Sequence, residues 1–271
     1  MGWPVQVVDS TGSTNADLVA RAAAGEQGPT VLVARAQTAG RGRLGRSWQS
    51  PPGASLAMSV LWRPVPPRTA WTWLPMVVGL GVLDALAQLG VDAARLKWPN
   101  DVVVPVSPGP DDPATGPGEG TPDGALTGLA KLAGILLEVA PGPAGPQAVA
   151  GVGVNLRPAA TGPGVRAAAL TDLLPGRRDG DGPDLDAVAP VLAGALRGRL
   201  DRWDRAADAD AGRLRQEYRE ACSTLGRRVR VTTPSGDVTG EAVDVAEDGA
   251  LVLRGPVGPV RVSAGDVEHV R

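Results

Sequence analysis

The sequence of 271 residues contains no phenylalanine, one tyrosine, one cysteine and one histidine. The single cysteine, Cys222, excludes an internal disulfide and a multi-cysteine metal site. It is typical of a protein from a reducing compartment, so we expect the cytoplasm. His269 is the only histidine, so a nucleophile based on histidine or cysteine is hard to assemble. Aromatic surface comes mainly from seven tryptophans.

The chain also lacks an excess of charge of either sign, since Lys+Arg 27 against Asp+Glu 29 leaves a formal net charge of −2. A protein that coats nucleic acid usually carries a basic excess, so any basic site must be local. We find no run of about 18 apolar residues and no basic segment followed by an apolar stretch at the start. The sequence therefore predicts neither a membrane span nor a signal peptide.

Hydrophobic periodicity and turn residues predict an α+β domain, in which a mixed central sheet is flanked by helices. A capping box with Thr14 as N-cap and Asp17 in the role of Glu begins the first helix. The antiparallel hairpins of the sheet fall in its second half. The expected helices cover residues 14–24, 72–90, 184–203 and 208–221, and the expected strands cover residues 31–34, 55–62, 95–98, 101–104, 131–139 and 148–156.

Two further segments differ in composition from this domain. Residues 105–128 are rich in Pro, Gly and Asp, and we expect a mobile excursion without chemistry of its own. After Gly226 the chain consists of short Val-rich runs separated by turn residues, which predicts a small all-β barrel. We therefore expect a large domain over residues 1–224 and a small one over residues 225–271.

The segment TAGRGRLGRSW, residues 38–48, is named here the arginine-glycine loop. It matches the spacing of a dinucleotide-binding fingerprint, but that fingerprint opens a helix and is followed by an acidic residue, and neither is found here. It also lacks the Gly-Lys-Ser/Thr ending of a P-loop. A solvated basic turn is the remaining structural alternative. Against it, glycines leave backbone amides free to approach an anion, the arginines add charge, and Trp48 offers a surface on which a base can stack.

Three other constellations carry less information when taken singly. The segment KWPND, Lys97 to Asp101, ends an apolar run and is also compatible with an ordinary turn. Lys131 begins the apolar run KLAGILLEV, where a lysine is commonly an exposed strand start. The run GVGVN, Gly151 to Asn155, places glycines where a ligand or another backbone must come close.

In this order, and preceded by the STN of residues 13–15, these segments closely resemble the biotin protein ligases. The resemblance runs from about residue 7 to the end, and the small C-terminal barrel agrees with the SH3-like domain of that family. Many bacterial members carry an N-terminal helix-turn-helix that represses transcription. Here the ligase-like part begins almost at Met1, so we expect a form without that domain and without DNA binding.

The resemblance implies a fold like that of the class II synthetases and a reaction in two steps. Biotin and ATP give biotinyl-5′-AMP and pyrophosphate, and biotin then passes to one lysine of a biotin carboxyl carrier domain of an acetyl-CoA or acyl-CoA carboxylase. By resemblance, the biotin-binding residues are Ser13, Thr14, Asn15, Gln37, Gly40, Arg41, Lys131, Gly151 and Gly153, the ATP and adenylate contacts are Arg43, Arg46, Trp48, Lys97, Asn100 and Asn155, and the catalytic residues are Arg41, Arg43, Asp101 and Lys131.

The cofactors implied are ATP and Mg²⁺, with Mg²⁺ held mainly by the ATP phosphates and no protein ligand assigned. A lipoate ligase would share the fold and both steps, but that family lacks the arginine-glycine loop paired with KWPND. A ligand-sensing regulator needs a basic recognition helix, which we do not find. A simple binding module would not need so rich an anion site. A homodimer is compatible with the sequence.

Overall fold

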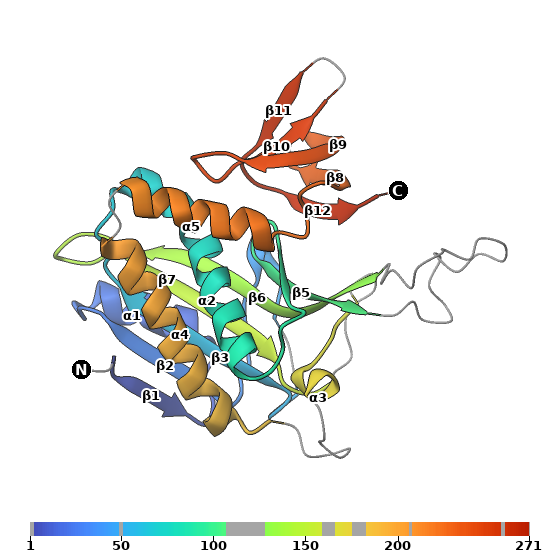
Figure 1. Ribbon diagram of the computed structural model, residues 1–271. Coiled ribbons are helices and arrows are strands. Elements are labelled where there is room, and N and C mark those ends of the chain that lie inside the picture. Colours follow the sequence, from blue (N-terminus) through green and yellow to red (C-terminus); the bar gives the residue numbers. More distant parts are fainter. Residues whose placement is uncertain are drawn as a thin grey trace.

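The computed structural model describes residues 3–48, 51–106, 128–158, 166–174, 183–205, 208–255 and 258–270. Its centre is a seven-stranded sheet with the strand order β1-β2-β3-β7-β6-β5-β4 (Figure 1). Strand β1 pairs with β2 in parallel, and all the other pairs are antiparallel. The strands are β1 (Val5–Val8), β2 (Thr30–Ala34), β3 (Ser55–Trp62), β4 (Arg95–Lys97), β5 (Asp101–Val106), β6 (Gly128–Ala140) and β7 (Gln147–Asn155). This confirms the expected mixed sheet.

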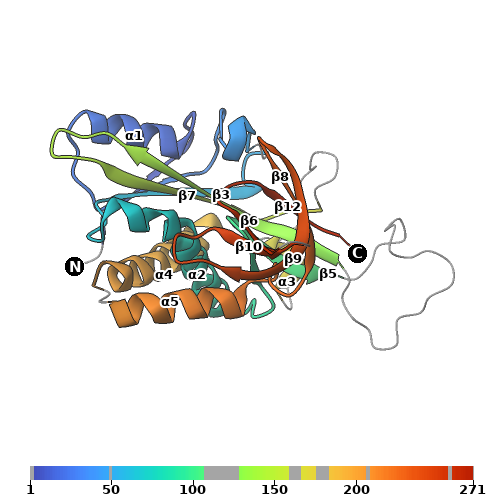
Figure 2. The same ribbon diagram turned by 90° about the horizontal axis from the view of Figure 1, so that it is seen from above.

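Helices cover both faces of the sheet, as Figure 2 shows from above. Helix α1 (Thr14–Ala23) lies on one face, and α2 (Leu74–Gln88), α4 (Leu185–Arg205) and α5 (Asp208–Ala221) lie on the other. A 3₁₀ helix, η2 (Arg68–Trp73), leads into α2, and α3 (Leu170–Leu173) is a single turn. Helix α2 is apolar on almost every side because it packs between the sheet and α4.

The segment Arg68–Gln88 is long and apolar enough to cross a membrane, with a mean hydropathy of 1.5 in its best window of 18 residues. In the structure 67% of that window is buried inside the protein. Its apolar surface faces β5, β6 and α4, which is the position of a core helix. Length and composition therefore do not make this helix a membrane span.

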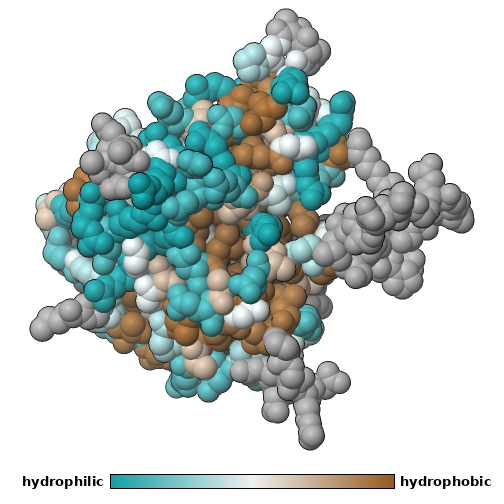
Figure 3. All heavy atoms as spheres, in the orientation of Figure 1, coloured by the Kyte–Doolittle hydropathy of each residue, from teal (hydrophilic) through white to brown (hydrophobic). Residues whose placement is uncertain are grey.

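Ion pairs join the three helices of this layer. The Arg199 guanidinium on α4 contacts Asp84 of α2 and Glu217 of α5, and the hydrogen bond with Asp84 raises its pKa. Helix α5 buries Leu214 and Tyr218, one turn apart, and turns its polar residues outward. The outer side of α5 is accordingly hydrophilic in Figure 3.

A second, five-stranded antiparallel sheet follows, named here the C-terminal sheet, with the order β11-β10-β9-β8-β12. Two fully buried tryptophans of the large domain anchor it. The indole N–H of Trp73 donates to the Glu247 carbonyl at 2.8 Å, and that of Trp98 donates to the Gly249 carbonyl at 3.0 Å. The strands are β8 (Arg228–Thr233), β9 (Gly236–Val245), β10 (Leu251–Arg254), β11 (Pro259–Val262) and β12 (Asp266–His269).

The structure corrects several local expectations. The N-cap of α1 is Ser13, whose side chain accepts from the Ala16 amide, and not Thr14. Asp17 accepts instead from the Thr11 hydroxyl. Strand β1 and helix α3 are too short to show a period in the sequence. Residues 105 and 106 belong to β5 and residue 128 to β6, while residues 107–127 of the expected excursion lie outside the described residues.

The close contact between α2 and α4 at Gly81 allows the packing of the core to be tested. A Cβ at Gly81 would lie 3.0 Å from Leu196 Cδ2 and 3.2 Å from Leu196 Cα. We expect Gly81→Leu to lower the free energy of unfolding by about 1 to 3 kcal/mol, because the larger side chain overpacks this contact. Urea unfolding followed by circular dichroism measures it. Gly194→Ala is the control, since nothing lies within 4 Å of that exposed helical position and helix propensity favours alanine.

An unchanged midpoint in Gly81→Leu would show that the two helices separate without cost at this contact.

Candidate active site

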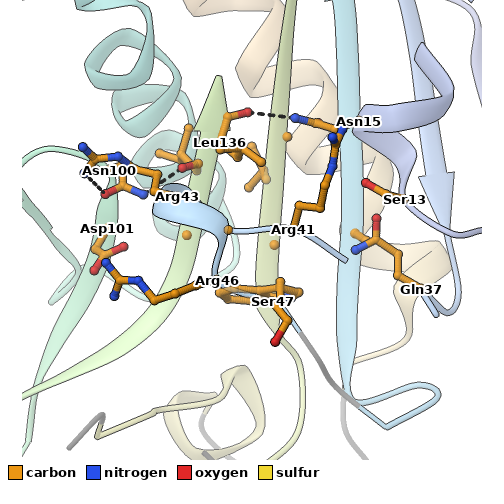
Figure 4. Close-up of a pocket in the computed structure, with 18 of the residues that line it drawn as sticks. Ser13, Asn15, Gln37, Arg41, Arg43, Arg46, Ser47, Asn100, Asp101 and Leu136 are labelled. Carbon is orange, nitrogen blue, oxygen red and sulfur yellow. Dashed lines mark hydrogen bonds between the residues drawn. The ribbon is translucent and has the colours of Figure 1, made fainter. Parts of the chain in front are cut away.

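A cavity of about 430 Å³ lies on the face of the sheet that carries α1, and it is named here the cleft. Figure 4 shows the side chains that converge on it from α1, the arginine-glycine loop, β5 and β6. Every residue proposed from the sequence lines it, except Gly40 and Lys97. The lining comprises Ser13, Thr14, Asn15, Gln37, Arg41, Gly42, Arg43, Arg46, Ser47, Trp48, Ala57, Met58, Asn100, Asp101, Lys131, Gly134, Ile135, Leu136, Gly151, Val152, Gly153, Asn155, Ala167 and Asp266.

The floor of the cleft is built from small residues placed side by side by the strand register. Gly153 of β7 lies between Ala57 of β3 and Gly134 of β6, and Gly134 pairs in turn with Asp101 of β5. Residues of one face recur at every second position along a strand, so Gly151 and Asn155 share this face with Gly153. The glycines let other side chains lie directly on the sheet, since Trp48 covers Gly153 and Gly134 and Asn15 covers Gly151.

Neutral hydrogen-bonding groups occupy one end of the cleft, named here the polar end. Gln37 Oε1 accepts from the Thr14 amide at 2.9 Å and lies 3.1 Å from the Thr14 hydroxyl. Ser59 Oγ lies 2.7 Å from Thr14 Oγ1 and 2.6 Å from Asn15 Oδ1. Ser13, Thr14, Asn15 and Ser59 are all buried. These contacts lock each side chain in one orientation before a ligand arrives.

Asn15 and Arg41 meet a carboxylate that the sequence did not point to. The Asn15 amide donates to the Leu136 carbonyl at 3.1 Å and to Glu138 Oε2 at 2.8 Å. The Arg41 guanidinium donates to the same oxygen at 2.9 Å. Arg41 thus extends toward the polar end (Figure 4). Its expected catalytic role stays a prediction.

The arginine-glycine loop is a short hairpin closed by its own backbone. The Trp48 amide donates to the Gly40 carbonyl at 2.9 Å, and the Gly42 amide donates to the Arg46 carbonyl at 2.6 Å. A Cβ at Gly40 would collide with the Trp48 carbonyl and the Gln37 side chain. Gly40 therefore serves the hairpin although it does not line the cleft.

Trp48 lies inside the cleft against the glycine floor. A Cβ at Gly153 would lie 2.6 Å from its ring, and Lys131 Nζ lies 5.5 Å from its ring centroid. Its indole N–H is buried without a hydrogen-bond partner among the described residues. An unpaired donor at this place is costly unless a ligand accepts it. Contact with adenine stays a prediction.

Cations gather at the opposite end, named here the cationic end. Lys131 Nζ lies 2.6 Å from Asp101 Oδ1. Arg43 donates to Asn100 Oδ1 at 3.2 Å and to the Gly265 carbonyl at 3.3 Å, and Arg46 pairs with Asp266 of the C-terminal sheet. Neutral partners leave the charge of Arg43 uncancelled, so the cationic end is suited to an anion with several charges.

At two positions burial strengthens the attraction of the cationic end for an anion. It lowers the pKa of the Arg43 guanidinium, and it lowers the pKa of Lys97, which lies behind Asp101. A shift in this direction means that the surroundings do not fully compensate the positive charge. An incoming anion would supply the missing charge and so would bind well.

The chain contains two lysines: Lys131 lies at the cationic end, and Lys97 lies close to it. Every other basic side chain except His269 is an arginine. An ammonium group is a compact point charge, whereas a guanidinium is a broad planar fork. The backbone of Lys131 is held in place by Asn155. The Asn155 side-chain amide donates to the Lys131 carbonyl at 3.1 Å and to the Ala168 carbonyl at 3.0 Å. Asn155 therefore positions Lys131 as well as lining the cleft.

Several contributors could not be found by motif. Ser59 and Asp266 lie in ordinary strand patterns, and only the strand register or the docking of the C-terminal sheet brings them to this site. Gly134 and Glu138 had a signal, since both stand within the run KLAGILLEV, but that run was interpreted for Lys131 alone. Among the described residues, no group of three His, Cys, Asp or Glu side chains is arranged to hold a metal ion.

Comparison with known proteins gives this arrangement a family. The model of the "Biotin/lipoate A/B protein ligase family" matches residues 6–155, and that of the "Biotin protein ligase C terminal domain" matches residues 224–270. The chain is 41% identical over 277 residues to the biotin–[acetyl-CoA-carboxylase] ligase of Mycobacterium tuberculosis, covering 100% of this chain and 91% of that protein. The enzyme of the same name from Paracoccus denitrificans is 33% identical, with 95% and 97% covered.

Among solved structures, the biotin protein ligase from Aquifex aeolicus in complex with biotin and ATP superposes with a TM-score of 0.74 at 24% identity, covering 99% of each chain. A cleft with a neutral polar end and a cationic end, on a sheet of this topology, suits a ligase that joins a carboxylic acid to a nucleotide. The chain belongs to the biotin/lipoate A/B protein ligase family, as a biotin protein ligase with the C-terminal domain of that enzyme. This confirms the resemblance and the fold class expected from the sequence.

His269 of β12 allows the burial of a side chain in the C-terminal sheet to be tested through the pH dependence of stability. Its Nε2 is buried without a partner among the described residues, and burial, followed by the charge of Lys97, lowers its pKa from 6.5 to about 4. Between these values the unfolded chain binds more protons than the folded protein, so stability falls as the pH drops from 6.5 toward 4. We expect His269→Gln to remove about 1 kcal/mol of that loss near pH 5, allowing for solvent screening.

Urea unfolding of both proteins at about pH 7 and about pH 5 measures the difference. An identical change in the free energy of unfolding in the two proteins would contradict the buried, neutral state of His269.

Proposed function

We propose that this protein is an ATP-dependent biotin–[acetyl-CoA-carboxylase] ligase. It activates biotin as biotinyl-5′-AMP and transfers the biotinyl group to a lysine of a biotin carboxyl carrier domain. The observation that carries this proposal is the cleft itself, in which a neutral polar end and a cationic end share one floor of glycines. The similarity to curated ligases over the whole chain supports it.

In the first step a carboxylate oxygen of biotin attacks the α-phosphorus of ATP, and the bond to pyrophosphate breaks. Both reactants are anions, so the protein must lower their repulsion before they can meet. Lys131, Arg43 and Arg46 supply positive charge at one end of the cleft, and Lys97 adds to it from outside the lining. Lys131 is the residue that we assign to the carboxyl and phosphate oxygens.

Recognition of biotin falls to the polar end. The ureido ring offers two N–H donors and one carbonyl acceptor. Ser13, Thr14, Asn15 and Gln37 present hydroxyl and amide groups of both kinds. Contacts with one another and with Ser59 already orient Thr14, Asn15 and Gln37, and the Ala16 amide holds the Ser13 hydroxyl. Gly151 leaves room for the Asn15 side chain, and Gly153 would let the valeryl chain approach the sheet once Trp48 moves off it. Arg41 borders the biotin from the loop, and Gly40 shapes the hairpin that carries Arg41. The adenylate would lie toward Trp48, Asn100 and Asn155.

In the second step the amine of the carrier lysine attacks the acyl carbon, AMP leaves, and the amine loses a proton. A covalent enzyme intermediate is not needed, because the mixed anhydride is already activated. Asp101 is the carboxylate closest to the reacting groups and is assigned as the group that helps to remove the proton. Its Oδ1 lies 2.6 Å from Lys131 Nζ.

The donor set of the cleft fits Mg²⁺ as a companion of ATP. Magnesium prefers oxygen ligands and is commonly held by one or two carboxylates together with substrate phosphates. Asp101 and Asp266 both line the cleft at the cationic end. The ATP phosphates would mainly hold the ion, with Asp101 and Asp266 beside it, and the ion would neutralise phosphate charge.

Several broader expectations belong to the same proposal. We place the catalytic domain at residues 1–224 and the C-terminal domain at residues 225–271, in keeping with the match to residues 224–270. The partner is the carrier domain of a carboxylase, the enzyme acts in the cytoplasm, and it binds neither DNA nor membranes. A homodimer is compatible with this function.

The function is tested by pyrophosphate release from ATP and Mg²⁺, with biotin, with lipoate or with no acid. We expect release with biotin alone, because the polar end matches a ureido ring, whereas lipoate offers a dithiolane without hydrogen-bonding groups. Release with lipoate would keep the chemistry but overturn the biotin assignment. No release with either acid would overturn the proposed function.

Lys131 provides a sharper test of the first step. We expect Lys131→Ala and Lys131→Arg both to lower kcat for pyrophosphate release by about a hundredfold or more, because a preorganised charge at the reacting oxygens is lost or displaced. Arginine keeps the charge, but it puts a broad planar fork in place of a compact ammonium that lies 2.6 Å from Asp101 Oδ1 and 5.5 Å from the Trp48 ring centroid. Arg197→Lys, at an exposed pair with Asp201, is the control.

Turnover of Lys131→Arg close to that of the parent protein would show that only net charge matters at this position.

A further inference from the structure

Three arginines of the arginine-glycine loop hold three different anchors. Arg43 contacts Asn100 and Gly265, Arg46 contacts Asp266, and Arg41 contacts Glu138. In Figure 4 Arg41 extends toward Asn15, whereas Arg43 extends toward Asn100. The first two anchors are at the cationic end, and the third is at the polar end.

These anchors respond differently to a bound nucleotide. Phosphate oxygens compete directly for Arg43 and Arg46, whose present partners are an amide, a carbonyl and a half-exposed carboxylate. Glu138 is remote from that competition, because it is joined to Asn15 at the polar end. The Arg41–Glu138 contact is therefore the anchor that survives when ATP or the adenylate occupies the cleft.

Glu138 also joins three separate parts of the chain. It stands on β6, and its Oε2 accepts from Asn15 of α1 at 2.8 Å and from Arg41 of the loop at 2.9 Å. Asn15 holds Ser59 in turn, at 2.6 Å. One carboxylate oxygen thus sets both the side chains of the polar end and the position of the loop above them.

Global stability is a poor explanation for this pair. The side chains of Arg41 and Glu138 are 43% and 27% exposed, and ion pairs of such exposure add little to the free energy of unfolding. The loop is short, largely exposed and rich in glycine, so a single tether strongly restricts where it lies. The effect of the pair falls on the cleft and its ligand.

We propose that Glu138 is a positioning residue that latches the arginine-glycine loop over the biotin end of the cleft through Arg41 while it orients Asn15. This inference rests on the proposed function. The latch slows the escape of biotin and of the adenylate and keeps water from the mixed anhydride. It does not touch the reacting atoms, so its loss changes binding and retention more than the chemical step.

The test compares Glu138→Ala and Glu138→Gln with Glu26→Ala. Glu26 is a matched control, since it accepts from Arg21 at 2.6 Å and from Thr30 at 2.8 Å, is 28% exposed, and does not line the cleft. We expect Glu138→Ala to raise KM for biotin about tenfold while kcat at saturating biotin changes by less than about twofold. Without carrier, more biotinyl-5′-AMP should be found free in solution per pyrophosphate released.

Glu138→Gln keeps a neutral acceptor for both partners, so we expect it to restore most of the affinity. The double variant Arg41→Ala/Glu138→Ala should be no worse than the worse single variant, because both changes open the same contact. A KM for biotin and a free-adenylate fraction within about twofold of the parent in Glu138→Ala would overturn the proposal. Additive effects in the double variant would also overturn it.

Amide hydrogen exchange without ligand tests the latch independently of activity. We expect faster exchange over residues 40–48 in Glu138→Ala than in the parent or in Glu26→Ala, and equal exchange would overturn the proposal. Absence of biotin-dependent pyrophosphate release by the parent protein would instead overturn the proposed function. Should Glu138→Ala fail to fold, Arg41→Ala opens the same contact from the loop side, and exchange over residues 40–48 equal to that of the parent in this variant would overturn the proposal.

Discussion

The structure depends on holding several cations together in a half-buried cleft. Arg43, Arg46, Lys97 and Lys131 would repel one another, and burial already lowers the pKa of Arg43 and Lys97. Partners on other elements reduce this cost, namely Asn100 after β4, Asp101 of β5 and Asp266 of β12. The C-terminal sheet is therefore part of the cleft, and Trp73 and Trp98 anchor it where Asp266 is needed.

The sheet contributes a surface and a register. Ala57, Gly153, Gly134 and Asp101 lie in one row across four strands, which forms a floor with a carboxylate at one side. Trp48 covers Gly153 and Gly134 on this floor, and among the described residues its buried indole N–H has no acceptor. The small residues of the strands thus form the floor of the cleft, and the larger residues of the loop cover it.

The two ends of the cleft ask for different physical properties. Recognition of a neutral ring needs hydrogen-bonding groups in fixed directions, which Thr14, Gln37 and Ser59 provide by holding one another. A reaction between two anions needs positive charge that is not already neutralised by the protein. Arg43 provides such charge, because its hydrogen-bond partners are neutral. Arg41, on the same loop as Arg43, serves the polar end because Glu138 lies within its reach.

The sequence by itself determined the elements with a clear period and the residues that stand in contiguous motifs. The bounds predicted for strand β3 and helix α5 agree with the structure. The structure also brings the segments at residues 13–15, 37–48, 97–101, 131 and 151–155 to the cleft or next to it. Only the tertiary structure decided the rest. Glu138, Ser59 and Asp266 acquire their roles from strand register and domain docking, and Ser13 rather than Thr14 caps α1. Such contacts join residues far apart in the chain, and no local spacing encodes them.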